Sequence, residues 1–347
     1  MPYRLTVRNI GPSCLFDLTW GQSQQLTATL PYPMQLDALY QAWQKTYLSY
    51  YHNALRGRPG IAGKVTAPVN WHSQLAQAEA KLLSEFHRWL QQGELFQLRT
   101  ALLSALSKTE ATVDLFLTCQ SMELARLPWE TWEVGAESGG AARLRLSRSP
   151  ANVEATISPR RQLRQGKPRF LVILGDATGL NLTQDRAALE SLQSLATVQF
   201  WSSDPKQAAG ELRESLAQAI ADPLGWDGLI FAGHSGEASA VGGEIQIAPR
   251  VSLSLRELTG YVQQAGNRGL QFALFNSCCG LDIANSLIKL GLSQVVMMRE
   301  QVHDQVAAAF LLQFLRGLLR QLDVHEALLE ARRYLQSEKH LTYPQLN

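Results

Sequence analysis

The C-terminal half of the chain alternates short apolar runs with segments of helical periodicity. The apolar runs are Phe170–Leu174, Val198–Trp201, Trp226–Ala232, Phe272–Phe275 and Val295–Met298. Helical patterns separate or follow them at about 184–195, 206–221, 254–265, 281–290, 304–321 and 324–336. Short strands that are apolar on both faces and alternate with helices are typical of a parallel sheet sandwiched by helices. We therefore predict an α/β domain over residues 169–347.

The N-terminal part has a different pattern. Tyr3–Arg8 and Cys14–Trp20 alternate apolar and polar residues around a turn sequence, which predicts a hairpin. We expect two long amphipathic helices and two short strands to follow, at about 35–51, 73–92, 113–119 and 142–146. These elements predict an α+β accessory lobe over residues 1–150. A loop at 57–70 and a polar, basic linker at 151–168 complete the organisation.

Composition excludes several classes of function. Lysine plus arginine number 32 against 30 acidic residues, a net charge of +2, so no clustered positive charge favours nucleic acid. The longest apolar runs fall far short of the ~20 residues that span a bilayer, and the N-terminus lacks the apolar region of a secretion signal. Four cysteines form no disulfide framework. We expect a cytoplasmic protein without nucleic-acid or membrane partners.

Two strand ends carry the residues that are best suited to chemistry. Functional groups in open α/β sheets collect beyond the carboxyl ends of the strands. One predicted strand runs into Gly233-His234-Ser235-Gly236 and the next into Asn276-Ser277-Cys278-Cys279. A single helical crossover joins these strands, so we expect them to be neighbours, about 4.8 Å apart. His234 and Cys278 would then lie near hydrogen-bonding range.

An imidazole beside a thiol is a known basis for nucleophilic catalysis. A free thiol is only a few per cent ionised at neutral pH, and a neighbouring imidazole raises the thiolate fraction and later protonates the leaving group. The backbone N–H groups of Ser235 and Cys278 are candidates to stabilise a developing oxyanion. A structural histidine and a buried, inert cysteine remain the alternative to this dyad.

Other motifs point to other chemistry, and each departs from its pattern. Gly233–Glu237 nearly matches the serine-hydrolase elbow G-x-S-x-G, but Glu237 replaces the last glycine. Leu174–Gly179 follows a strand as phosphate-binding loops do, yet it has neither nucleotide fingerprint. The adjacent Cys278 and Cys279 do not have zinc-ligand spacing. We therefore predict no cofactor and no metal.

Several segments together resemble the CHAT peptidases, a caspase-like (clan CD) cysteine peptidase family related to separases, and the cyanobacterial-type members look most similar. The segments are FAGHSGE, the stretch from LQFALFNSCCGLDIANSL to AAAFLLQFLRGLL, LPWETW, LGDATGLNLTQDRAAL and ALLEARRYLQ. The resemblance covers about residues 110–340.

The resemblance implies a caspase-like fold with a mostly parallel sheet, and a cysteine endopeptidase that cleaves protein or peptide substrates. The family's dyad falls on His234 and Cys278. Asp176 becomes a candidate contact for a basic P1 side chain, and Asp304 matches an acidic position of the family, although it also suits a helix cap. Regulation by a protein partner or by further domains is implied, as is a longer parent protein.

This chain also departs from the family pattern. Ser235 stands where caspase-fold enzymes usually have glycine, and Cys279 stands where similar chains often have aspartate, so Cys279 is a second candidate nucleophile. The caspase signature Q-A-C-x-G is absent, so aspartate specificity is not implied. A catalytically inactive caspase-fold interaction or signalling module is the alternative function.

Overall fold

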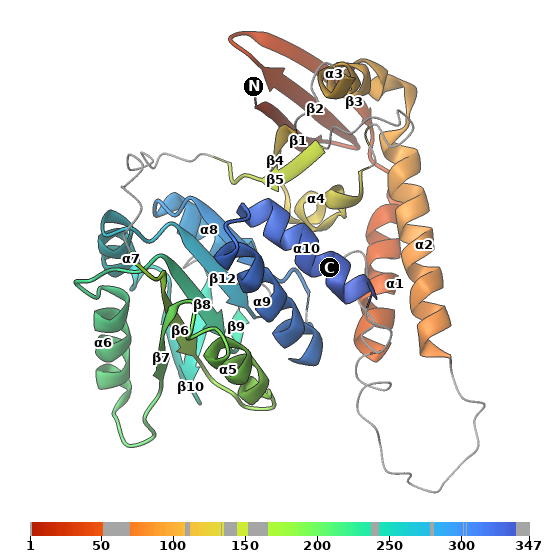
Figure 1. Cartoon of the computed structure of the whole chain (residues 1–347). Helices are drawn as coiled ribbons and strands as arrows, with labels where there is room; N and C mark the ends of the chain where they lie inside the picture. The colour runs from red at the N-terminus through yellow and green to blue at the C-terminus, as the bar shows by residue number, and fades with distance from the viewer. Residues whose placement is uncertain are drawn as a thin grey trace, which may run out of the picture. The chain divides into compact units, whose positions relative to one another are not determined.

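The computed structural model in Figure 1 describes residues 2–50, 70–107, 112–132, 134, 144–151, 166–236, 243–277, 281–300, 302 and 304–337. The chain forms two compact units, of which the first ends at Ala151 and the second contains the described residues from Gly166 onward. The predicted loop at 57–70 and linker at 151–168 lie almost entirely outside the described residues. Within the ranges just given, no helix is long and apolar enough to cross a membrane.

The first unit contains a mixed five-stranded sheet in the order β3-β2-β1-β4-β5. Its strands are β1 (Tyr3–Ile10), β2 (Ser13–Trp20), β3 (Gln24–Pro31), β4 (Val113–Cys119) and β5 (Leu144–Arg148). The predicted hairpin is confirmed, because β1 and β2 pair antiparallel, whereas β4 pairs parallel with both β1 and β5. The strand β3 was not predicted; it is an edge strand whose side chains are mostly exposed, although Leu26, Ala28 and Leu30 alternate with Thr27 and Thr29.

Helices and an aromatic core complete this unit. The helices are α1 (Gln35–Tyr50), α2 (Trp71–Leu90), α3 (Phe96–Ser107) and the short α4 (Met122–Arg126), with 3-10 turns η2 (Gly93–Leu95) and η3 (Trp129–Thr131). The rings of Phe86 and Trp129 meet edge to face at 5.4 Å, and Trp89 and Phe16 do so at 5.3 Å. Aromatic side chains of this size supply much of the apolar area that a core of this kind buries.

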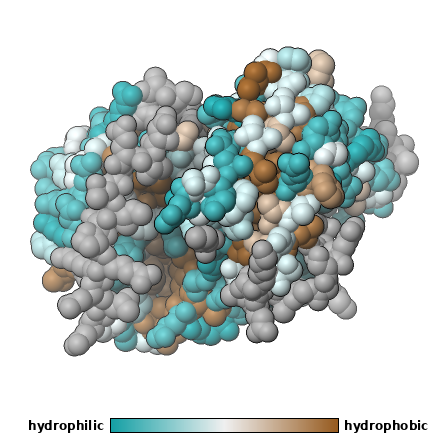
Figure 2. Space-filling view, turned by 90° about the horizontal axis from the view of Figure 1, so that it is seen from above, coloured by the Kyte–Doolittle hydropathy of each residue, from teal (hydrophilic) through white to brown (hydrophobic). Residues whose placement is uncertain are grey.

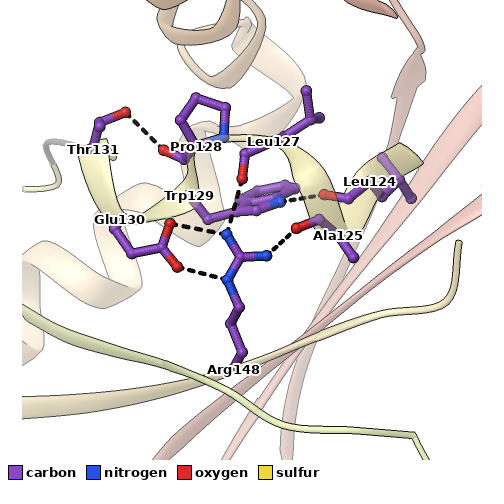
Figure 3. A network of polar contacts seen from close by, with 8 residues as sticks. All are labelled: Leu124, Ala125, Leu127, Pro128, Trp129, Glu130, Thr131 and Arg148. Carbon is purple, nitrogen blue, oxygen red and sulfur yellow. Dashed lines mark hydrogen bonds and ion pairs between the residues drawn. The ribbon is translucent and has the colours of Figure 1, made fainter. Parts of the chain in front are cut away.

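One arginine fastens the segment around η3 to the sheet (Figure 3). Arg148, at the end of β5, donates from Nε and Nη2 to the two carboxylate oxygens of Glu130 at 2.6 and 2.9 Å. Its remaining donors reach the carbonyl oxygens of Leu127, at 3.0 Å, and Ala125. Burial opposes the charge of this guanidinium, but the Glu130 carboxylate more than offsets that effect, and the pKa of Arg148 is raised. A side chain of β5 thus ties the LPWE sequence to the sheet.

Replacing Arg148 with methionine should lower the free energy of unfolding of the protein by about 3 kcal/mol, because Glu130 and two carbonyl groups lose their donor. Urea unfolding followed by tryptophan fluorescence measures the loss. The matched control is Arg88→Met, which removes the ion pair between the exposed Arg88 and the partly buried Glu85 and should cost less than about 1 kcal/mol. Equal losses in the two variants would contradict the structural role of Arg148.

The second unit contains a five-stranded, all-parallel sheet in the order β13-β12-β8-β6-β7. The strands are β6 (Arg169–Leu174), β7 (Thr197–Ser202), β8 (Gly228–Ala232), β12 (Phe272–Asn276) and β13 (Gln294–Met297). The predicted α/β class with a parallel sheet is therefore confirmed. Each predicted strand lies within two residues of its observed position. The central strands β6, β8 and β12 are runs of mostly buried apolar residues, which leave little ambiguity, whereas the edge strands β7 and β13 are only partly buried.

Helices cover both faces of this sheet (Figure 1). They are α5 (Leu182–Glu190), α6 (Ala209–Ile220), α7 (Thr259–Asn267), α8 (Leu281–Lys289), α9 (Asp304–Leu319) and α10 (Val324–Ser337). The chain moves from β6 outward to β7 and then turns back across the sheet, so right-handed crossovers put α5 on one face and α6, α7 and α8 on the other. Trp201 of β7 contacts Ser215 of α6, whereas Phe272 of β12 stacks near Phe314 of α9 on the α5 side.

A small antiparallel sheet was not predicted. It consists of β9 (Ser235–Gly236), β10 (Glu244–Ala248) and β11 (Val251–Ser254), in the order β11-β10-β9. The helix predicted from Ser254 begins only at Thr259, because Ser254 ends β11. Strands of two to five residues carry too few alternations to be recognised from periodicity.

Large hydrophobic side chains are exposed at scattered positions in both units. On the face seen in Figure 2, hydrophobic residues form small groups between hydrophilic ones. The most exposed side chain of this kind is Met34, at 88%, in the first unit, followed by Leu224, at 69%, in the second. Exposed apolar residues of this scattered kind are normal for folded proteins, so they assign no function to a surface.

Candidate active site

Buried polar side chains gather at one edge of the parallel sheet. Among the described residues, those classed as buried and polar or charged are Asp176, Asp185, Ser277 and Glu300. Asp176, Ser277 and Glu300 follow the carboxyl ends of β6, β12 and β13, and Asp185 of α5 is hydrogen-bonded to Asn276, the last residue of β12. Because burying a polar group is costly, this concentration marks the edge as a candidate site.

The strand order places the switch point of the sheet at this edge. From β6 the chain crosses outward to β7, and from β8 it proceeds in the opposite direction, so the loops after β6 and β8 diverge from adjacent strands. In open α/β sheets, ligands bind outside the carboxyl ends of the strands at such a point. The loop after β6 begins with Gly175 and Asp176, and the loop after β8 contains Gly233 and His234.

The main chain of β10 ties these two loops together. Gln246 donates its N–H to the carbonyl oxygen of His234 at 2.9 Å, and its own carbonyl oxygen accepts from the N–H of Asp176 at 2.9 Å. Gly175 donates to Ala232 at 2.9 Å. A Cβ atom on Gly175 would lie 2.4 Å from the Gln246 carbonyl oxygen, so this approach requires glycine. The loop that contains His234 is therefore hydrogen-bonded both to β10 and to the loop after β6.

Replacing Gly175 with alanine should therefore displace β10 from both loops. We expect a loss of stability of about 2 kcal/mol, in the range for overpacking a close contact, and a loss of any activity that depends on His234. Thermal unfolding measures the first effect, and an assay of that activity measures the second. The control variant is Gly210→Ala in α6, where an added Cβ atom would have no neighbour within 4 Å. A Gly175→Ala variant as stable as the control would contradict the argument.

A main-chain carbonyl group orients the imidazole of His234. Its Nε2 lies 2.8 Å from the carbonyl oxygen of Thr178. A carbonyl oxygen only accepts hydrogen bonds, so Nε2 carries the proton and Nδ1 of the neutral ring is the acceptor. The same bond is charge-assisted in a ring that carries two protons. Sequence patterns did not indicate Thr178, because a backbone acceptor has no residue-type signal.

Asp176 in turn holds Thr178. Its Oδ1 accepts from the hydroxyl of Thr178 at 2.7 Å and from the N–H of Thr178 at 3.1 Å, and the residue is 6% exposed. The observed role of this carboxylate is therefore to fix the turn that presents the Thr178 carbonyl group. The predicted contact of Asp176 with a basic substrate side chain stays a prediction.

The ends of β8 and β12 meet as the sequence predicted. The strands are neighbours with Ala232 opposite Asn276, and Ser235 donates its hydroxyl hydrogen to the hydroxyl oxygen of Ser277 at 2.9 Å. The residue after His234 therefore contacts the residue before Cys278. Cys278 and Cys279 themselves, Glu237 and the side chain of Asp304 lie outside the described residues. The dyad and the oxyanion role of the Ser235 and Cys278 N–H groups stay predictions.

The surroundings of Ser235 do not match a serine-hydrolase elbow. Ser235 belongs to β9 and pairs with Ile245 of β10, whereas an elbow serine lies on a tight turn from a strand into a helix. Its hydroxyl group is engaged with Ser277 rather than with an imidazole. Across the ranges that the structure describes, no three His, Cys, Asp or Glu side chains gather as metal ligands.

No protein-family model matches the chain, and no curated protein matches it in sequence. The site must therefore be interpreted from its own geometry. In this geometry, the protonated Nε2 of His234 is hydrogen-bonded to the Thr178 carbonyl oxygen. The neighbouring Ser235 contacts Ser277, in the loop that continues into the two cysteines.

Proposed function

We propose that the protein is a cysteine endopeptidase of caspase-like fold, similar to the CHAT peptidases, that cleaves protein or peptide substrates in the cytoplasm. Cys278 is the nucleophile, and His234 is the general base and acid. The observation that carries the proposal is the 2.8 Å hydrogen bond from His234 Nε2 to the Thr178 carbonyl oxygen, because it leaves Nδ1 as the proton acceptor. The Ser235–Ser277 contact supports it by joining the histidine loop to the loop that leads to Cys278.

The proposed reaction consists of two acyl transfers, first to Cys278 and then to water. His234 Nδ1 takes the thiol proton of Cys278, and the thiolate attacks the scissile carbonyl carbon. The oxyanion that forms is stabilised by the N–H groups of Ser235 and Cys278. The imidazolium then protonates the leaving amine, the C–N bond breaks and a thioester remains. A water molecule gives a proton to His234 and attacks the thioester, whose C–S bond breaks. The acid product is released, and the imidazolium returns its proton to the leaving thiolate, which restores the thiol of Cys278 and the neutral imidazole.

Two further features support this assignment. Two of the segments that resemble the CHAT family, GDATGLNLTQD and FAGHSGE, contain Asp176, Thr178, Asp185 and His234, all at the edge described above. The all-parallel sheet with helices on both faces is compatible with a caspase-like core. Regulation by a protein partner or by further domains belongs to the same proposal, and the first unit is the accessory lobe.

A mixture of peptides from a digested proteome tests the proposed activity without knowledge of the substrate. The full chain is incubated with the peptides, and new amino termini are identified by mass spectrometry. We expect cleavage at a defined set of sites, and its loss after alkylation of the protein with iodoacetamide. Cleavage that persists after complete alkylation of Cys278 would overturn the proposal.

The second candidate is an inactive caspase-fold interaction or signalling module. The serine at position 235 favours this second candidate, because members of the family usually have glycine at this position. The Ser235 hydroxyl group is hydrogen-bonded to Ser277. This module would show neither peptide cleavage nor preferential alkylation of Cys278 over an ordinary thiol. Cleavage of peptides by the native chain, or preferential alkylation of Cys278, would exclude this module.

A further inference from the structure

A buried carboxylate of α5 is bonded to the end of β12. Asn276 donates from Nδ2 to Oδ1 of Asp185 at 2.9 Å, and Asp185 is 3% exposed. The two residues are 91 positions apart in the chain, and the strand β8 lies between β6, which precedes α5, and β12. The bond therefore reaches past the strand that carries His234 and joins the element after β6 to the strand that leads to Cys278.

The register of β12 explains why the two side chains meet. Side chains alternate between the faces of a strand, so Asn276 shares a face with Phe272 and Leu274. Phe272 contacts Phe314 of α9, which places this face on the side that α5 and α9 cover. On α5, Asp185 and Leu189 are buried and lie four residues apart, so both belong to the inward stripe of the helix. A charged residue on an apolar stripe is the signal that sequence patterns offered for this contact.

Stability alone does not account for a carboxylate at this position. An apolar side chain of similar volume would pack against the sheet without the cost of removing a charge from water, and such replacements of buried ionic groups are often neutral or stabilising. The location in the first turn of α5 favours a negative charge, and the amide of Asn276 provides a hydrogen bond. These contacts offset the cost of burial, and they fix the direction in which β12 ends.

We infer that Asp185 is a positioning residue that holds Asn276, and through it the start of the Ser277-Cys278 segment, in register with His234. This inference rests on the proposed function for its catalytic consequence. Its structural content is independent of catalysis. Without an acceptor at position 185, the end of β12 loses its link to α5. We then expect Cys278 to lose the alignment with the imidazole that the proposed dyad requires.

Two variants of Asp185 in the full chain test the inference. Asp185→Leu removes the acceptor and keeps the volume, whereas Asp185→Asn keeps an oxygen acceptor for the Asn276 amide. Alkylation of Cys278 by iodoacetamide is measured from pH 5.5 to 10 by peptide mass mapping, in a Cys279→Ala background. In Asp185→Leu we expect the rate at pH 6.5 to fall by about 10-fold or more, as for a misplaced reacting group, and the rate at pH 10 to stay unchanged. Asp185→Asn should remain within about threefold of the parent.

Hydrogen exchange gives a second measurement that does not depend on catalysis. Amides of the segment Phe272–Ser277 should exchange faster in Asp185→Leu, and those of Arg169–Leu174 should not. Glu190→Gln is the control, since it breaks the exposed ion pair between Arg186 and Glu190 on the same helix and should alter neither measurement. If the amides of Phe272–Ser277 exchange in Asp185→Leu at the same rates as in the parent protein, the inference is wrong.

His234→Ala separates failure of the inference from failure of the proposed function. If alkylation of Cys278 in the parent has the profile of an ordinary thiol and His234→Ala leaves it unchanged, the proposed dyad fails. The exchange result then still decides whether Asp185 anchors β12. If the pH profile of Cys278 alkylation depends on His234 but is unchanged in Asp185→Leu, the proposed dyad stands and the positioning role of Asp185 is wrong.

Discussion

Replacing Cys278 with alanine is expected to abolish labelling by a thiol-reactive peptide probe and to reduce peptide cleavage by about 10⁴-fold or more, because loss of a nucleophile removes the covalent pathway. Replacing Cys279 with alanine is expected to leave both nearly unchanged. Labelling at pH 7.5 followed by mass mapping of the modified peptide measures the first effect, and cleavage of the peptides identified with the native chain measures the second.

The other two cysteines should not interfere with this experiment. Burial raises the pKa of the Cys14 thiol to about 11, and burial in the first unit likewise raises the pKa of Cys119 to about 12. A raised pKa leaves the thiol protonated at pH 7.5, so its thiolate, the reactive form, is scarce. If the Cys278→Ala variant is still labelled, and the label is found on Cys279, then Cys279 is the nucleophile. Labelling of both cysteines at equal rates would instead indicate ordinary thiols.

Replacing His234 is the second change with a large expected effect. His234→Ala should lower the rate of cleavage by about 10³-fold, within the range for loss of a general base. The pH profile of Cys278 alkylation should also change. An isolated thiol ionises near pH 8.5, so the reactivity that the parent shows below pH 7 should disappear, and the rate should rise in one step around that pH.

A glutamine at this position separates chemistry from structure. His234→Gln keeps an N–H donor for the Thr178 carbonyl group but cannot take up a proton near neutral pH. We expect it to fold with native stability in thermal unfolding and to be as inactive as His234→Ala. Substantial cleavage by His234→Gln would show that the imidazole is not the base, and the Thr178 contact would then be structural.

Much of the fold was predictable from the sequence. Runs such as Phe170–Leu174 and Phe272–Phe275 are apolar on both faces, which already requires a sheet covered on both sides. Their alternation with helical patterns requires parallel strands. The short strands β9 to β11 escaped prediction, since periodicity is weak where strands are brief. The edge strand β3 was also missed, although its apolar residues alternate with polar ones.

The candidate site was predictable only in part. The adjacency of the two strand ends follows from a single crossover, and Ser235 and Ser277 do meet. The contacts of Thr178 and Gln246 could not be foreseen, because they use main-chain atoms. The position of Asp185 on an apolar stripe indicated a buried contact but not its partner, which lies 91 positions away in the chain.

The order of apolar runs along this chain was sufficient to determine the class of its second unit and the strand ends where polar residues gather. Local patterns contain that information, since burial on both faces of a strand requires a run of apolar residues. Only the tertiary structure decided which nitrogen of His234 carries the proton and what anchors β12. Those properties depend on hydrogen bonds between segments that are distant in sequence, and their geometry exists only once the sheet has assembled.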